Sequence, residues 1–300
     1  MRALAIGTGL VADRVFADPE QHHPVAYFGT WATVTERLLY RDSTAAGVTH
    51  LLVTVAPVAL AAQWLHSKAP TLTTAATLWI ALGGSSLTRV GEQVATELSA
   101  GHIERARTWV PWLCSRDPQQ LDDAGIARAA TESIAENTSD AAIAPLFWAA
   151  VGGAPTVVVH RCVNTLDAMV GYRNERYNNF GWAAANLDDL LAYVPARLTA
   201  GIHTLCAAIS GRGSEAVRAW KEDASAHPSP NAGPVEATAA AALGVQLGGP
   251  TIYPHGTEQR PRLSRGPKPT ADTVRAAVRL ARRTQLIAGV LAVLFSAQRG

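Results

Sequence analysis

The helical fold is indicated by two neighbouring apolar stretches, VTHLLVTVAPVALAAQWLH at residues 48–66 and TLTTAATLWIALGGSSLT at residues 71–88. Each stretch approaches the roughly 17 to 25 residues that a helix needs to cross a bilayer. Only the residues SKAP separate them, so they predict a helical hairpin in the membrane, although Pro57 and the Gly83–Gly84 pair interrupt the two spans. The alternative is a pair of helices buried in a soluble protein.

Three further apolar runs are weaker, at 141–163, 190–210 and 285–297. The first is broken by glycines and a proline, the second contains Pro195 and Arg197, and the third is short. Broken backbone and arginine are tolerated at membrane depth only where protein or water lines them. We therefore expect re-entrant or protein-buried helices in the first two runs.

The composition supports a membrane protein and excludes two other classes. Of the 300 residues, 48% are hydrophobic and only 17% are charged, against roughly 25% charged in a typical soluble protein. A net charge of +2 without a dense basic block argues against nucleic acid as a partner. The 3 cysteines lie outside any C-x-x-C pair, which argues against a disulfide framework and a structural zinc site.

The positions of the arginines predict a topology, because short loops rich in Arg and Lys stay in the cytoplasm. Such residues are frequent in 89–140 and in 211–283, so we expect both segments on the cytoplasmic side. The second segment is rich in turns, which predicts a loop layer over the helices. The fold class we predict is all-α: a single membrane-embedded domain over 1–300, a multi-pass helical bundle in the cytoplasmic membrane with broken or re-entrant helices.

A stripe of acids is the first candidate site. Glu132, Glu136 and Asp140 are spaced four residues apart, so a helix would stack their carboxylates on one face, where each like-charged pair costs roughly 0.2 to 0.5 kcal/mol. A cation between them would remove that cost. The alternative is a solvated face in which Arg128 pairs with Glu132.

The segment HRCVNTLDAMVGYRNERYNNFG, residues 160–181, is the second candidate. On a helix His160, Asn164 and Asp167 share one face, and Gly171 would end that helix. The residues after Gly171 form an amide, phenol and guanidinium cluster that suits phosphates and carboxylates. Its members are Tyr172, Arg173, Asn174, Arg176, Tyr177, Asn178 and Asn179.

Two more polar stretches complete the candidates. In NLDDLLAYVPAR, residues 186–197, Asp188 and Asp189 point about 100° apart on a helix, so one could bind metal while the other holds a basic group. An N-terminal cap pair is the alternative. In WKEDASAHPSPNAGPVEA, residues 220–237, His227 and Asn231 lie on a turn before an Ala-rich helix, whose free N–H groups could receive an anion.

Several common motifs are absent from the sequence. There is no G-x-x-x-x-G-K-[ST] loop and no G-x-G-x-x-G fingerprint, so a bound nucleotide would be held in some other way. There is also no G-x-S-x-G elbow and no H-E-x-x-H motif.

Read in order, four segments resemble the adenosylcobinamide-phosphate synthase family of cobalamin biosynthesis (CobD/CbiB). They are FADPEQHHPVAYFGTWATVTERLLY, ATESIAENTSDAAIAPLFW, HRCVNTLDAMVGYRNERYNNFGWAAANLDDLLAYVPARLTA and HPSPNAGPVEATAAAALGVQLGGPTIY. The resemblance covers about residues 12–285. One departure is Ala17 in Ala17-Asp18-Pro19, where the family usually has Gly, and the first apolar helix is shorter than is usual.

The resemblance implies a multi-pass membrane enzyme that uses ATP and Mg²⁺. Its substrates would be adenosylcobyric acid and 1-amino-2-propanol or its O-phosphate, joined by an amide bond, with membrane lipid around the protein and the active site facing the cytoplasm. It leaves room for a homo-oligomer. A carboxylate does not condense with an amine in water, so ATP must first convert it into a phosphoric anhydride, and negative charge develops in both steps.

The resemblance also suggests roles for the candidate residues. Glu132, Glu136 and Asp140 would hold metal, with Asp167 as a further ligand, and the catalytic pair Asp188 or Asp189 would supply a second metal contact or the base that deprotonates the amine. The residues expected to bind phosphate, ATP or the corrinoid side chains are Arg161, Asn164, Tyr172, Arg173, Asn174, Arg176, Tyr177, Arg197, His227 and Asn231.

Two other functions remain open at this point. An intramembrane prenyl or phosphatidyl transferase would also use carboxylates and Mg²⁺, but it should show two clusters of the D-x-x-x-D or D-x-x-D type, which this sequence lacks. A non-enzymatic scaffold or permease would place its polar residues along a path through the bilayer, whereas here they gather in loops and at helix ends.

Overall fold

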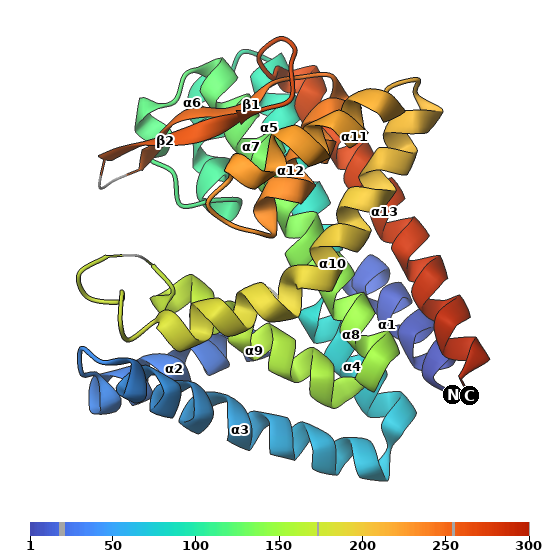
Figure 1. Cartoon of the computed structure of the whole chain (residues 1–300). Helices are drawn as coiled ribbons and strands as arrows, with labels where there is room; N and C mark the ends of the chain where they lie inside the picture. Colours follow the sequence, from blue (N-terminus) through green and yellow to red (C-terminus); the bar gives the residue numbers. More distant parts are fainter. Residues whose placement is uncertain (18–21, 173, 254–255, 300) are drawn as a thin grey trace. The chain divides into compact units, whose positions relative to one another are not determined.

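The computed structural model describes residues 1–17, 22–172, 174–253 and 256–299, and it is mostly helical (Figure 1). The chain forms two compact units. The first comprises Met1–Gly83, Asp140–Ala192 and Ala288–Gly300, and the second comprises Gly84–Ser139 and Tyr193–Ile287. Both units are assembled from segments that are distant in sequence.

Helices make up the described part of the first unit. They are α1 (Arg2–Phe16), α2 (Pro24–Leu39), α3 (Thr44–Lys68), α4 (Pro70–Ala81), a π-helical turn within Ser139–Ile143, α8 (Ala144–Gly152), α9 (Ala154–Val170), the start of α10 (Trp182–Ile209) and the end of α13 (Ala271–Gln298). The start of α3 is capped by Ser43, whose Oγ accepts the Ala46 N–H at 3.3 Å. Proline opens α2 and α4, where its missing N–H costs nothing.

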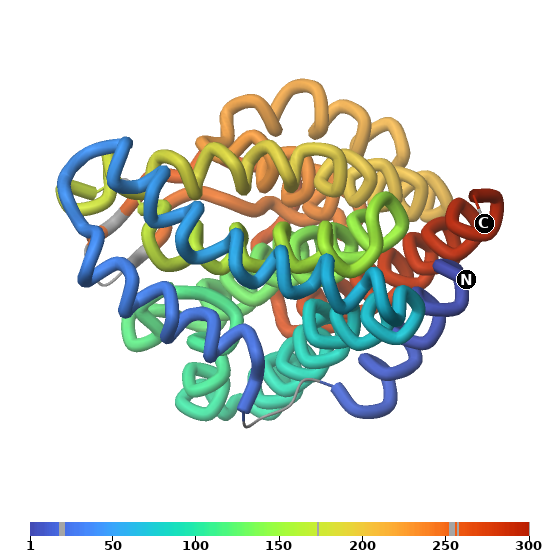
Figure 2. Tube along the Cα trace, turned by 90° about the horizontal axis from the view of Figure 1, so that it is seen from below, coloured from blue at the N-terminus to red at the C-terminus, as the bar shows by residue number. Residues whose placement is uncertain are grey.

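The core of the first unit lies between α2, α3 and α9. Phe28, Val163, Leu166 and Phe180 are buried there, and α3 runs alongside α9 in both ribbon views (Figures 1 and 2). Gly47 of α3 allows this packing at one point, because a Cβ added there would lie only 1.9 Å from the Phe180 carbonyl oxygen. No other residue type fits without moving the backbone of one segment.

The first stretch of the predicted hairpin is a single helix, as expected, but the second stretch is not. The first stretch lies within α3, a single helix of 25 residues. The second stretch divides, because Leu82 is extended and the Gly83 N–H donates to the Ala141 carbonyl at 2.8 Å, which ends α4 after 12 residues. Its remaining residues begin α5 in the second unit.

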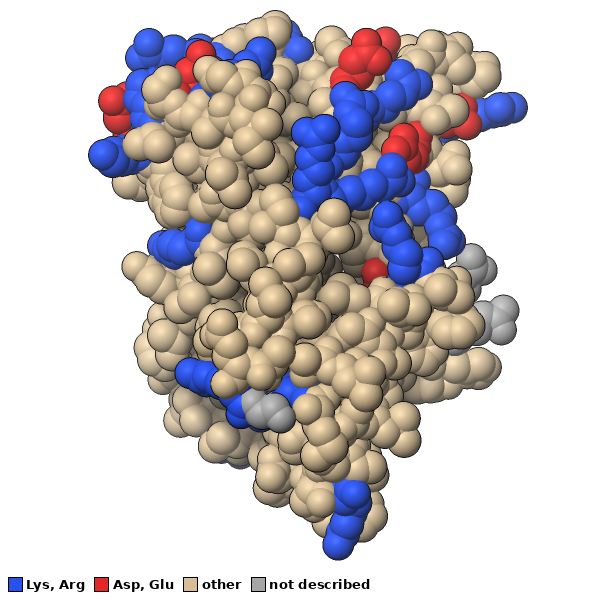
Figure 3. Space-filling view, turned by 90° about the vertical axis from the view of Figure 1, so that its right-hand side faces the viewer, with Lys and Arg blue, Asp and Glu red and all other residues tan. Residues whose placement is uncertain are grey.

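Two helices in the described residues are long and apolar enough to cross a membrane, α3 and α13. The sequence run 285–297 had looked too short, but it continues a helix of 28 residues that begins at Ala271. The apolar windows of both helices are mostly exposed, at 28% and 39% buried. On the face shown in Figure 3 most of the surface is uncharged, and Lys and Arg gather in separate groups.

The second unit combines helices with one small sheet. Its elements are α5 (Gly84–Ser99), α6 (Ile103–Trp109), the 3-10 turns Val110–Trp112 and Pro118–Gln120, α7 (Asp123–Thr138), the rest of α10, α11 (Gly213–Glu222), the 3-10 turn Ala224–Ala226, α12 (Ala232–Leu243), β1 (Leu247–Tyr253), β2 (Gly256–Leu263) and most of α13. Helix α12 is buried on all sides, as its alanines predict, and Gly244 ends it in the left-handed conformation at φ 69°.

Strands β1 and β2 form an antiparallel hairpin in which Gly249 pairs with Arg260 and Pro250 with Gln259. The register shifts between Leu247 and Gly249, as at a β-bulge. The all-α prediction therefore needs this hairpin added. The predicted loop layer at 211–283 is also wrong in part, because α11, α12, the β-hairpin and the start of α13 together occupy most of it. The turn residues that suggested loops connect short elements.

Candidate functional site

A cavity of about 260 Å³ lies in the second unit, between α7, the segment before the 3-10 turn Pro118–Gln120, the start of α12 and the β-hairpin. We call it the glutamate pocket, because three glutamates line it. Its charged and hydroxyl-bearing side chains are Ser115, Arg116, Glu132, Ser133, Glu136, His227, Glu236 and Arg260. The polar lining contrasts with the apolar cores on either side of it.

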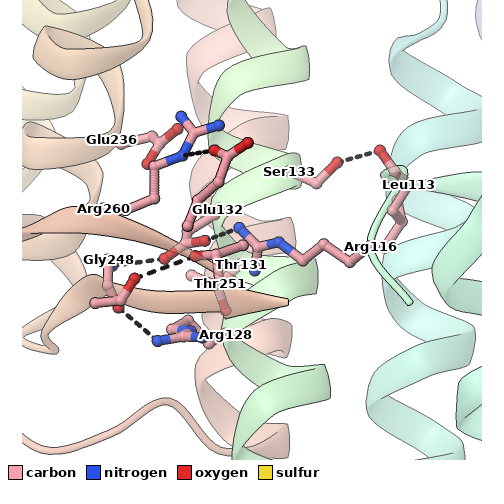
Figure 4. Close-up of polar contacts among 12 residues, drawn as sticks. Leu113, Arg116, Arg128, Thr131, Glu132, Ser133, Glu236, Gly248, Thr251 and Arg260 are labelled. Carbon is pink, nitrogen blue, oxygen red and sulfur yellow. Dashed lines mark hydrogen bonds and ion pairs between the residues drawn. The ribbon is translucent and has the colours of Figure 1, made fainter. Parts of the chain in front are cut away.

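Helix α7 places Glu132 and Glu136 one turn apart on the face that borders the pocket. Glu132 is buried and forms an ion pair with Arg116, whose side chain is 10% exposed. Its other oxygen accepts the Gly248 N–H at 2.6 Å, and Figure 4 shows Glu132 between these two partners. Glu132 therefore connects α7 to the loop at Arg116 and to the start of β1.

The predicted solvated pair between Arg128 and Glu132 is not formed. Arg128 instead donates to the carbonyls of Gly248, at 2.6 Å, and of Pro250. Both residues of α7 thus hold the same strand. Ser133 adds a third contact, since its hydroxyl donates to the Leu113 carbonyl at 2.5 Å. These contacts fix one wall of the pocket.

Glu236 is the second buried acid of the pocket, beside Glu132. Burial raises its pKa well above the ordinary value, and the negative charges of Glu132 and Glu136 raise it further. His227 lies beside this carboxyl group, with Nε2 3.9 Å from Glu236 Oε1. Arg260 reaches the same His227 nitrogen at 3.4 Å. Since burial lowers the pKa of His227, this histidine is a neutral hydrogen-bonding group near pH 7.

The pocket contains side chains of the types that bind divalent cations and phosphate groups. A buried carboxyl with a raised pKa beside two further glutamates is a site where an added positive charge would be stabilised. Carboxylate oxygens are the protein ligands that Mg²⁺ prefers. The guanidinium groups of Arg116 and Arg260, also in the lining, have the fork geometry that binds phosphate oxygens.

Only two of the three acids in the stripe predicted from the sequence, Glu132 and Glu136, lie on α7. Asp140 follows α7 in the π-helical turn, where the α-helical period is interrupted, and it belongs to the first unit. Among the residues that the structure describes, no group of three or more His, Cys, Asp or Glu is arranged to hold a metal ion by itself. Metal binding by Glu132, Glu136 and Asp140 stays a prediction.

The polar groups of the turn before α12 form hydrogen bonds with one another and with Arg197. Ser229 Oγ accepts the N–H groups of Asn231 and Ala232, at 3.3 and 3.2 Å, so part of the helix start is already capped. Arg197 donates to Asn231 Oδ1 at 2.5 Å and to the Pro230 carbonyl at 2.9 Å. The structure thus brings Arg197 and Asn231 together, as contacts that hold the turn, and it places His227 in the glutamate pocket.

A second polar cluster lies in the first unit, around the loop after α9. Glu36 of α2 accepts hydrogen bonds from Arg176 Nη2 and from the Tyr177 hydroxyl, both at 3.0 Å. The Arg176 guanidinium also lies 4.2 Å from the centre of the Tyr40 ring. The Asn174 side chain accepts the Tyr177 N–H at 2.9 Å. Arg176, Tyr177 and Asn174 therefore hold the loop in place.

Two other residues singled out in the sequence, Tyr172 and His160, contribute no side-chain hydrogen bond to either polar cluster in the part of the chain that the structure describes. Tyr172 is exposed. Arg173 lies outside the described residues. His160, which the sequence placed on the face of Asn164 and Asp167, is fully buried, and no described residue is a hydrogen-bond partner for its ring nitrogens.

Helices α9 and α10 bring the predicted aspartates together. Asn164 donates to Asp188 Oδ1 at 3.3 Å, and Arg161 lies 3.5 Å from Asn164 Oδ1. Burial raises the pKa of Asp167 to about 6, and the charge of Asp189 adds to this. The cap-pair alternative is excluded, because α10 begins at Trp182, well before Asp188. Asp188 thus contacts Asn164, while the charge of Asp189 acts on Asp167.

The sequence reasoning missed Arg116, Glu236, Arg260 and Glu36. Glu236 carried a usable signal, because it is the only charged residue of α12 and every neighbour is apolar or small. A single acid inside a buried helix requires a partner or a function. The other three belong to loops or ordinary amphipathic segments, and only the folded chain shows what they contact.

Comparison with known proteins adds a consistent finding. A family model described as "CobD/Cbib protein" matches residues 6–281. A protein of Mycobacterium tuberculosis named "Cobalamin biosynthesis protein CobD" is 48% identical over 303 aligned positions, covering 99% of this chain and 97% of the relative. Proteins of the same name from Chromobacterium violaceum and Halalkalibacterium halodurans are 43% and 36% identical, covering 94% and 97% of this chain and 92% and 95% of those relatives. No solved structure gives a significant match.

Proposed function

This chain belongs to the CobD/Cbib protein family, and we propose that its step in cobalamin biosynthesis is an ATP-dependent amide ligation. The acid substrate would be adenosylcobyric acid and the amine (R)-1-amino-2-propanol O-2-phosphate or aminopropanol, giving adenosylcobinamide phosphate from the phosphorylated amine. The family relationship supports the pathway. The chemistry of the glutamate pocket supports the type of reaction.

The observation that carries the proposal is the combination of three glutamates and two arginines in one polar cavity. Amide formation from a carboxylate first needs a mixed anhydride with phosphate, formed when a carboxylate oxygen attacks a phosphorus atom of ATP and ADP or pyrophosphate leaves. The first step places negative charge on phosphate oxygens. Attack of the amine places it on the carbonyl oxygen and then on the phosphate that departs. Guanidinium groups stabilise that charge, and acids hold the accompanying cation.

Within the pocket, Glu136 and Glu236 are the residues we assign to Mg²⁺, since Glu132 is already bound to Arg116 and Gly248. The ion would supply charge neutralisation for the phosphates of ATP. Arg260 is the group we assign to the transferred phosphate. Arg116 supports it while holding Glu132, so its removal would affect both the fold and the phosphate site.

The amine must lose a proton as it attacks. We assign this role to Asp167 in the first unit, whose pKa of about 6 lets it accept a proton at neutral pH. Asp189 acts on it by raising that pKa. Asp188 and Asn164 orient the neighbouring Arg161 side chain, which we assign to the negatively charged groups of the substrates.

The protein is proposed to be embedded in the cytoplasmic membrane, with α3 and α13 as spanning helices. Their apolar windows are long enough and mostly exposed, so water would be an unfavourable environment for side chains such as Leu60 and Leu286, each 69% exposed. The corrinoid and ATP would reach the glutamate pocket from the cytoplasm.

The proposal is tested with protein purified in detergent, ATP, Mg²⁺, adenosylcobyric acid and aminopropanol phosphate. We expect mass spectrometry to show a corrinoid heavier than the acid by the amine minus one water, formed only when ATP is present. Free aminopropanol in a parallel reaction identifies the preferred amine. Failure to form either product with folded protein would overturn the ligase assignment.

A further inference from the structure

A second cavity, of about 230 Å³, lies in the first unit and has no role in the proposed reaction. The start of α1, the end of α3, the start of α4 and the end of α13 surround it. Figures 1 and 2 both show the start of α1 close to the end of α13. We call it the terminal pocket, and its polar lining consists of Arg2, His66, Thr71, Thr74, Ser296 and Arg299.

The lining of the terminal pocket is suited to an anion. It contains two arginines, a histidine and two threonine hydroxyls, and no described lining residue is acidic. Helix α4, of 12 residues, begins here with Ala69 as its N-cap and no side-chain cap. Its first N–H groups and the positive end of its dipole therefore add to the positive charge.

A second observation, independent of the charges, points to a ligand: a buried hydroxyl has no hydrogen-bond partner among the described residues. Ser296 of α13 is only 2% exposed and lines the pocket, yet its Oγ has no hydrogen-bond partner among the described residues. Elsewhere in α13 the Thr284 hydroxyl donates to the Leu280 carbonyl at 2.9 Å, the usual arrangement inside a helix. A buried hydroxyl without a hydrogen-bond partner is unfavourable, and an oxygen atom of a bound ligand would accept its hydrogen bond.

The two arginines are held near the pocket by other contacts. Arg2 donates from Nη1 to the carbonyls of Ala150 and Val151, at 3.2 and 3.1 Å. The Arg299 guanidinium lies 4.4 Å from the centre of the Phe295 ring. Positions fixed in this way reduce the entropy lost when a ligand binds.

The surroundings identify the source of the anion. The two helices that are long and apolar enough to span a membrane, α3 and α13, both end at this pocket. Trp64, Leu65, Leu72 and Leu294 are exposed on the helix segments next to it. A tryptophan near the end of a spanning helix is typical of the membrane interface. We propose that the terminal pocket binds the phosphate of an anionic phospholipid, whose acyl chains lie along these exposed apolar side chains.

The test measures lipid binding without any substrate, so its result is independent of the ligase assignment. Detergent-purified protein is titrated with dioleoylphosphatidylglycerol, dioleoylphosphatidylcholine or inorganic phosphate, and the melting temperature is followed. We expect a saturable rise with phosphatidylglycerol and none with phosphatidylcholine. Inorganic phosphate at the same concentrations should give no rise, because it lacks the acyl chains.

Variants of two lining residues test whether the lipid binds in the terminal pocket. Arg299→Gln removes a charge, and Ser296→Ala removes the hydroxyl without adding any group to this buried position. Each should raise the half-saturating phosphatidylglycerol concentration roughly five- to tenfold. The matched control is Lys68→Gln, which removes an exposed charge at the end of α3 outside the lining.

Three results would overturn the proposal. An equal rise with inorganic phosphate would show that the occupant is a free anion. Equal weakening by Lys68→Gln would show diffuse attraction to the surface. Unchanged titrations of both pocket variants, each with the lipid-free melting temperature of the parent, would place any lipid elsewhere.

Discussion

The replacement of Glu236 by glutamine separates a catalytic role from a structural one. Glutamine keeps the shape of the side chain and removes its ability to ionise. The folded protein holds a proton on Glu236 that the unfolded chain releases above its ordinary pKa of about 4.5, because burial and the charges of Glu132 and Glu136 raise the folded pKa. Stability contributed by this proton is therefore lost as the pH rises, at roughly 1 kcal/mol per pH unit between the two pKa values.

The assay compares the parent and Glu236→Gln by thermal unfolding in detergent between pH 5 and pH 8, with and without Mg²⁺ and ATP. Without ligands, we expect the parent to lose stability relative to the variant as the pH rises. Mg²⁺ with ATP should flatten that dependence in the parent, because a bound cation stabilises the ionised carboxylate and lowers its pKa. The variant should lose turnover by roughly 10²-fold.

The control is Glu215→Gln, which changes an exposed glutamate of α11 outside the pocket. It should match the parent in turnover and in pH dependence. If Mg²⁺ with ATP leaves the pH dependence of the parent unchanged and Glu236→Gln turns over within a few-fold of it, the pocket does not hold the cation. The reasoning from Glu236 would then be refuted.

Three further predictions concern stability and pH. Arg116→Gln leaves the charge of Glu132 buried without its ion pair, and chemical denaturation should show a loss of about 3 kcal/mol or more. Asp167→Asn should abolish a rise in turnover that the parent shows as the pH increases through about 6, where this aspartate becomes ionised and able to accept a proton; a parent profile flat across that range would contradict its role as the base. Gly47→Ala forces a Cβ against the Phe180 carbonyl and should lower stability by about 1 to 3 kcal/mol, whereas Gly7→Ala, with nothing within 4 Å, should be neutral or stabilising by thermal unfolding.

The sequence predicted the helices well where the apolar pattern was uniform. Helix α3 carries its signal over its full length. Helix α13 was underestimated, because its first half bears arginines at positions such as Arg275 and Arg279 that break the apolar run while the backbone continues. In the second stretch of the predicted hairpin, the break at Gly83 depends on a hydrogen bond to Ala141, which local sequence cannot reveal.

For the glutamate pocket, the sequence identified the α7 side and missed the opposite side. Glu132 and Glu136 were found because helical spacing is a local property. Arg116 and Arg260 were not, since each reaches the pocket from an irregular segment or a short strand. Which partner neutralises a buried acid is decided by contacts between distant segments, as the choice of Arg116 over Arg128 for Glu132 shows.

The contacts of Glu132 and Arg128 with Gly248 also set the order in which the pocket can form during synthesis. These bonds join residues 116 and 120 positions apart in the chain, so α7 leaves the ribosome long before β1 exists. Until then the acids of α7 lack the strand whose Gly248 contacts Glu132. In a chain that stalls before residue 247 every other element that lines the pocket has been made, so the hairpin is the last wall of the pocket to be added.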